Sequence, residues 1–248
     1  MYNTIDDICN SCLHRELPVV FFDSCSILDI VNSLHSNSLP ENYALSAFEL
    51  IKLHKTSIWL ITSQNVCEEW KDNIDNVLST MDKEILKVDR NISSMTSLSN
   101  LLLNTSYQFP NISSLKITKH VRALSERFLN TCLHIERKVE HTLRAMQRVR
   151  KNEAPARKGK PEPKDCEIIE CFLDTCKSLK SKGFKGRFLF FTANKDDFGS
   201  NKKLKPPLDR QFSEIGAELI NSIDHVLAIA KGQEHKQVHL HVTSVGSA

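Results

Sequence analysis

The chain has 248 residues, of which 40% are hydrophobic and 25% charged, and a formal net charge of +3. This composition can bury a full core and predicts a soluble protein of one large domain or two small ones. No apolar run approaches the roughly 20 residues that span a bilayer, so we expect no membrane contact. Residues 1–15 lack a basic segment followed by an apolar one. We therefore expect no signal peptide and a cytoplasmic location.

Eight cysteines in a chain of this length indicate reduced thiols rather than a disulfide framework. Cys9 and Cys12, with His14 nearby, resemble half of a zinc site, but no second closely spaced pair completes it. We expect these cysteines to be small buried side chains of an N-terminal helix.

Short apolar runs alternate with amphipathic helical patterns along the chain. The predicted helices cover 4–14, 24–35, 41–54, about 64 to the late eighties, 119–151, 165–182 and 213–231. The predicted strands cover 18–22, 57–61, 187–191 and 237–243, while 91–115 and 152–164 are loops, the first with a short helix and the second basic and mobile. The alternation predicts an α/β fold with three layers, α/β/α, around a mainly parallel sheet. We expect a single domain, 1–248, in which 71–160 is a helical insertion.

Polar side chains with oxygen ligands recur where these strands end and where helices begin. Asp23 follows the first strand, and Glu68 and Glu69 lie one turn into the helix after the second strand. Asp165 starts a helix, and the third strand is followed by Asn194 and Asp197. Since parallel strands share one carboxyl edge, these side chains should be neighbours. Clustered carboxylates without His or Cys favour Mg²⁺ or Mn²⁺.

Ordinary structural roles compete with each of these assignments. Asp23 and Asp165 are also suitable helix N-caps, and Asp197 is a common turn residue. Only one of two consecutive glutamates can face the site, and we prefer Glu69 because the apolar Trp70 follows it. Glu170 is expected to face solvent.

Positive charge is concentrated in the middle of the chain. Between Lys116 and Lys160 there are thirteen Lys and Arg residues against four Glu. Such an excess indicates a surface for a polyanion, although a solvated helix surface would look the same. The candidate phosphate contacts are Arg148, Arg150, Lys151, Arg157, Lys158 and Lys160.

Four short motifs, in order along the chain, resemble those of PIN-domain nucleases. They are Val-Phe-Phe-Asp23-Ser-Cys-Ser, Val66-Cys-Glu-Glu69-Trp, Lys164-Asp165-Cys-Glu-Ile-Ile, and Phe-Phe-Thr192-Ala-Asn194-Lys-Asp-Asp197-Phe198. The resemblance covers roughly 18–70 and 160–200. It does not cover 71–155, which is longer than in small PIN toxins and is similar to the larger PIN-like branch.

The resemblance implies which residues would carry the chemistry. Asp23, Glu69, Asp165 and Asp197 would be the catalytic metal-binding set, with Asn194 as a further ligand and Ser24, Thr192 and Glu68 in support. Family members often have Asp at the position of Asn194, so this chain carries one negative charge fewer there. The implied activity is hydrolysis of RNA that depends on Mg²⁺ or Mn²⁺.

Three functions remain open from the sequence. A metal-dependent endoribonuclease acting on single-stranded RNA is favoured over a catalytically weak or inactive PIN-like module that binds RNA or a protein partner. A flap-type DNA nuclease ranks last, because helix–hairpin–helix signals are missing. A toxin or a phage-defence protein with an inhibitory or regulatory partner would fit by analogy, and a dimer is compatible with the sequence.

Overall fold

A five-stranded parallel sheet forms the centre of the protein. The computed structural model describes residues 2–34, 36, 39–40, 42–200 and 203–233. The strand order is β3–β2–β1–β4–β7. These strands are β1 (Val19–Phe22), β2 (Trp59–Ser63), β3 (Leu133–Ile135), β4 (Phe188–Phe191) and β7 (Ala217–Ile220). The predicted α/β class with a parallel sheet is confirmed.

The middle strand, β1, is apolar on both faces because helices cover both faces of the sheet. All four of its residues are at most 1% exposed. Successive side chains of a strand point to opposite faces. Accordingly, Phe21 packs against Phe172 on one side of the sheet, while Phe22 packs against Phe128 on the other.

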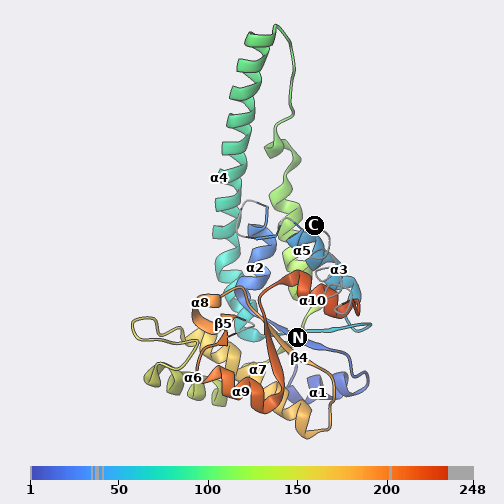
Figure 1. The fold of residues 1–248 in the computed structure, drawn as a ribbon, viewed down its shortest axis with the longest axis vertical. Coiled ribbons are helices and arrows are strands. Elements are labelled where there is room, and N and C mark those ends of the chain that lie inside the picture. Colours follow the sequence, from blue (N-terminus) through green and yellow to red (C-terminus); the bar gives the residue numbers. More distant parts are fainter. Residues whose placement is uncertain (1, 35, 37–38, 41, 201–202, 234–248) are drawn as a thin grey trace, which may run out of the picture.

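The helices form a layer on each face (Figure 1). One layer holds α1 (Ile5–Leu13), α6 (Val139–Lys151), α7 (Pro163–Ser181) and α9 (Leu208–Ile215). The other holds α2 (Ser24–Asn32), α3 (Tyr43–Leu53), α5 (Ile117–Thr131) and α10 (Ile223–Ala230). The predicted three layers are therefore present.

Helix α4 (Gln64–Leu103) begins at the end of β2 and extends far beyond the sheet as an arm (Figure 1). Its buried residues end at Met81, and the tip exposes Leu101, Leu102 and Leu103. The predicted end in the late eighties is wrong. Residues 91–103 contain no Pro or Gly, so the helix continues until Asn104, whose φ of 48° ends it. No helix in the described part of the chain is both long and apolar enough to cross a membrane.

Two predicted helices are each divided by a strand. The predicted helix 119–151 is α5, β3 and α6, because Leu133 and Ile135 pair with Ile61 and Ser63 of β2. The predicted helix 213–231 is the end of α9, then β7, then α10, and Gly216 makes the break with a φ of 73°. Part of the predicted insertion 71–160 therefore joins the sheet. The single-domain assignment stays a prediction, and the predicted strand 237–243 lies outside the described residues.

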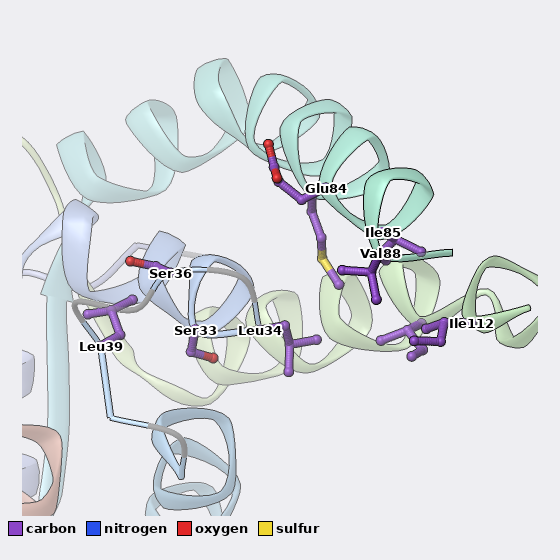
Figure 2. Close-up of a pocket in the computed structure, with 10 residues that line it drawn as sticks. Ser33, Leu34, Ser36, Leu39, Glu84, Ile85, Val88 and Ile112 are labelled. Carbon is purple, nitrogen blue, oxygen red and sulfur yellow. The ribbon is translucent and has the colours of Figure 1, made fainter. Parts of the chain in front are cut away.

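The return from the arm passes through a 3-10 turn (Ile112–Leu115) and lines a groove beside α4 (Figure 2). The groove has a volume of about 600 Å³ and is largely apolar, with Leu34, Ile85, Val88 and Ile112 among its lining residues. None of the predicted site residues lines it. It is therefore separate from the site described next.

Candidate active site

Asp23 lies where β1 ends, and its carboxylate has four hydrogen-bond donors around it. The Ser24 amide and hydroxyl donate to Oδ1 at 2.7 and 3.3 Å. The Thr192 hydroxyl and the Cys25 thiol donate to Oδ2 at 2.8 and 3.1 Å. Asp23 is the N-cap of α2, so its cap role and its place at the carboxyl edge of the sheet coexist. Burial raises its pKa, and these hydrogen bonds oppose the shift.

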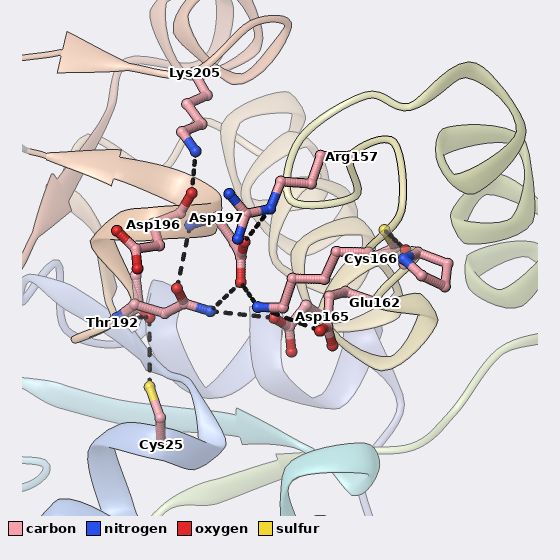
Figure 3. Close-up of polar contacts among 12 residues, drawn as sticks. Cys25, Arg157, Glu162, Asp165, Cys166, Thr192, Asp196, Asp197 and Lys205 are labelled. Atoms are coloured by element: carbon pink, nitrogen blue, oxygen red, sulfur yellow. Dashed lines mark hydrogen bonds and ion pairs between the residues drawn. The ribbon is translucent and has the colours of Figure 1, made fainter.

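Thr192 links the ends of two neighbouring strands. It follows β4, is fully buried, and donates its hydroxyl to Asp23. The same oxygen accepts the backbone N–H of Asn194 at 3.1 Å. One hydroxyl therefore holds both the Asp23 carboxylate and the start of the loop that carries Asn194 and Asp197. Figure 3 shows Thr192 beside the Cys25 thiol, with Asp196 and Asp197 on the loop that follows it.

The two consecutive glutamates of α4 have different environments. Glu68 accepts from Gln64 and pairs with Arg137 at 2.5 Å. Glu69 has a buried Oε2 without a hydrogen-bond partner. Burial raises the pKa of Glu69 and the negative charge of Asp23 raises it further, while the neighbouring Ser24 hydroxyl lowers it. Glu69, rather than Glu68, is therefore the glutamate that faces Asp23.

Asp165 lies in the first turn of α7 and is surrounded by other carboxylates. Burial raises its pKa to about 8, and the charges of Asp23, Glu69, Glu162 and Asp197 add to the shift in that order. The predicted acidic residues are thus close enough to feel one another's charge.

Asn194 connects the last two acidic positions. Its amide nitrogen donates to Asp197 Oδ2 at 2.8 Å and to Asp165 Oδ2 at 3.4 Å. Its oxygen accepts the Asp197 N–H, which caps the short helix α8 (Lys195–Phe198). Asp197 is buried in that turn, whereas Asp196 is exposed.

Asp197 has two cationic partners from the segment before α7. Lys160 Nζ contacts its Oδ2, and Arg157 Nε lies 3.4 Å from its Oδ1. Burial raises the pKa of Asp197, but the hydrogen bonds from Lys160 and Asn194 outweigh this and the net pKa is lowered. The sequence placed Arg157 and Lys160 among the phosphate contacts and gave no sign of this pairing.

The other basic candidates lie in two different settings, one buried and three exposed. Arg148 is buried, and its guanidinium donates to Glu170, the Ala154 carbonyl and Gln211. Its assignment as a phosphate contact is wrong, because the side chain is only 2% exposed and all three of its nitrogens already donate within the protein. The expectation that Glu170 faces solvent is also wrong, since it is buried beneath Arg148. Arg150, Lys151 and Lys158 are exposed.

The donor chemistry of this site suits a hard divalent cation. The acidic side chains offer only oxygen, and the unpartnered Glu69 Oε2 and the raised pKa of Asp165 both indicate uncompensated negative charge. In the described part of the chain, no three His, Cys, Asp or Glu side chains are already arranged to hold a metal ion. Mg²⁺ usually keeps several waters and takes one or two carboxylates, so it does not require such a ready-made set.

All eight cysteines are free, and Cys9 and Cys12 are buried on α1. Their burial on α1 agrees with the expectation of small side chains packed on an N-terminal helix.

The parallel five-stranded sheet with helices on both faces defines the structural class of this protein as α/β. The family model of the PIN domain matches residues 20–198. The chain therefore belongs to the PIN-domain family, whose members are generally nucleases and usually use divalent metals. No curated protein and no solved structure matches the chain significantly.

Proposed function

We propose that this protein is a metal-dependent endoribonuclease that hydrolyses phosphodiester bonds of single-stranded RNA. One observation carries the proposal: a continuous chain of hydrogen bonds joins Asp23, Thr192, Asn194, Asp165 and Asp197 across the carboxyl edge of the sheet. Side chains from the ends of β1 and β4 and from the start of α7 thereby meet in one acidic site, and Glu69 adds a fourth carboxylate from α4.

The proposed ligands are Asp23, Glu69, Asp165, Asn194 and Asp197, for Mg²⁺ or Mn²⁺. A divalent cation at such a site activates water and neutralises charge on a phosphodiester. Thr192 and Ser24 hold the Asp23 carboxylate in place, while Gln64 and Arg137 hold Glu68 beside the site. The exposed Arg150, Lys151 and Lys158 would attract the RNA backbone.

The test is cleavage of single-stranded RNA with Mg²⁺ or Mn²⁺. Asp23→Asn keeps the size of the side chain but removes a charge, so we expect cleavage to fall by about 100-fold or more. Asp196→Asn is the matched control because Asp196 is exposed and neighbours the site in sequence, and it should cleave like wild type. If Asp23→Asn cleaves as fast as wild type, the proposal fails.

A second candidate is a PIN-like module that binds RNA or a protein partner with little or no catalysis. Asn194 favours it, since an amide replaces a negative charge at a ligand position. RNA binding by a wild-type protein that takes up no Mn²⁺ in calorimetry would establish this candidate. Faster cleavage of branched DNA than of RNA would instead indicate the flap-type activity.

A further inference from the structure

A polar pocket lies beside the acidic site, toward β2 and β3. It lies between the N-terminal parts of α4 and α7 and the chain that follows β3, and has a volume of about 340 Å³. Small-molecule sites have about 300–1,000 Å³, so this volume suits a single nucleotide unit. The polar side chains that line the pocket are those of Asn65, Glu68, Asp72, Arg137, Lys164 and Glu167.

The pocket and the acidic site share two stretches of backbone. On α4, Glu68 lines the pocket while the next residue, Glu69, faces Asp23. On α7, Lys164 lines the pocket while the next residue, Asp165, belongs to the acidic site. The charge of Lys164 also acts on Glu69. If an RNA phosphate lies at the acidic site, a neighbouring base can therefore enter the pocket.

The pocket presents hydrogen-bond donors and acceptors together. Arg137 pairs with Glu68 at 2.5 Å, and Lys164 Nζ lies 3.6 Å from a carboxylate oxygen of Asp72. The exposed fractions of these four side chains are 42%, 41%, 57% and 66%, so each can also bond to a ligand. The Asn65 side-chain oxygen accepts from Arg137 Nε at 2.8 Å, which orients the guanidinium.

The charges of the pocket favour a neutral base over a phosphate. The carboxylates of Glu68, Asp72 and Glu167 line it together with two cations, so a phosphate would meet a net negative charge. Guanine has two adjacent donors, N1–H and the 2-amino group, that suit carboxylates, and two acceptors, O6 and N7, that suit Arg and Lys. Single-stranded RNA leaves these edges accessible.

We propose that this pocket binds the base beside the scissile phosphodiester and favours guanine. Glu68 and Asp72 accept hydrogen bonds from N1–H and the 2-amino group, and Arg137 and Lys164 donate to O6 and N7. Glu68 and Asp72 are four residues apart on α4, so their carboxylates lie on one face of the helix. The inference rests on the proposed function and adds a base preference to it.

Cleavage of single-stranded RNA of random sequence, with the product ends sequenced, tests the proposal. For wild type, we expect guanine to be favoured over adenine by about tenfold at one position beside the cut. Glu68→Gln and Asp72→Asn keep the side-chain size but remove a charged acceptor, so each should lower this preference severalfold. Asp75→Asn is the matched control, because Asp75 is exposed on α4 but lies outside the pocket, and it should keep the wild-type preference.

Two results would overturn the proposal. The first is a wild-type protein that cuts without preference for guanine, and the second is a full preference in both Glu68→Gln and Asp72→Asn. A wild-type protein that cleaves no RNA would instead overturn the proposed function. Nuclear magnetic resonance with guanosine, inosine and adenosine then tests the pocket without cleavage. Guanosine should bind most tightly, since inosine lacks the 2-amino group, and equal binding of the three would show that the pocket does not select guanine.

Discussion

The carboxyl group of Asp165 shows the electrostatic cost of gathering acids at one edge of a sheet. Its pKa rises to about 8, first by burial and then by neighbouring carboxylates. In the unfolded chain it would titrate near its ordinary value of 3.8. At pH values between about 3.8 and 8, Asp165 is protonated in the folded protein and ionised in the unfolded chain. The folded protein therefore loses stability as the pH rises toward 8.

Asp165→Asn should therefore stabilise the metal-free protein near pH 8 by on the order of 2 kcal/mol, and should change stability little near pH 4. Chemical denaturation in EDTA at the two pH values measures the difference. Added Mg²⁺ should stabilise the wild-type protein at pH 8 and should stabilise the variant less. A variant that is less stable than wild type at pH 8 in EDTA would contradict this reading of the site.

Thr192 offers a test of orientation without a change of charge. Thr192→Val has nearly the same shape but removes the donor to Asp23 and the acceptor for the Asn194 N–H. Loss of such a supporting hydrogen bond commonly lowers metal affinity or activity by roughly 10–100-fold. The Mn²⁺ affinity, measured by calorimetry, and the RNA cleavage rate should both decline by this amount. An unchanged Mn²⁺ affinity would show that Asp23 does not depend on Thr192.

At the scale of elements, Arg148 joins α6 to α7 through Glu170 and to α9 through Gln211. Arg148→Met leaves the buried Glu170 with fewer partners, and removal of one member of a buried ion pair costs about 3–5 kcal/mol. Arg150→Met, on the exposed side of α6, should change stability by less than about 0.5 kcal/mol. Thermal and urea denaturation separate the two variants.

The same pair of variants tests the basic surface. Arg150→Met should weaken RNA binding and reduce the slope of affinity against salt by about one phosphate contact. Arg148→Met should leave that slope unchanged in the folded fraction, because its guanidinium is not available to phosphate. An equal loss of salt dependence in both variants would place Arg148 on the RNA surface after all.

The elements that the sequence predicted correctly are those with strong local patterns. The apolar runs of β1, β2 and β4 stop at polar residues, and each corresponds to a buried strand. Strands β3 and β7 were missed for a different reason. Leu133–Ile135 continues the helical periodicity of its neighbours, and only pairing with β2, far away in sequence, makes it a strand. For β7, the local signal was Gly216, which ends α9. The helical periodicity of the flanking residues concealed this break.

At the scale of the whole molecule, the candidate site was predictable in outline because a parallel sheet directs all its strand ends to one edge. Asp23, Asn194 and Asp197 follow strands, and the crossover helix α7 brings Asp165 beside them. The positive partners of Asp197 were not predictable. Their position depends on the path of the turn at 157–160, which is fixed by burial of Ala154 and Ala156 rather than by a sequence pattern.

Anomalous diffraction from a crystal soaked in Mn²⁺ tests the central claim most directly, since it locates the ion among the side chains. We expect a Mn²⁺ peak within about 2.5 Å of carboxylate oxygens of the proposed set, Asp23, Glu69, Asp165 and Asp197. A crystal that takes up Mn²⁺ elsewhere, with no peak among these four side chains, would contradict the proposed metal site.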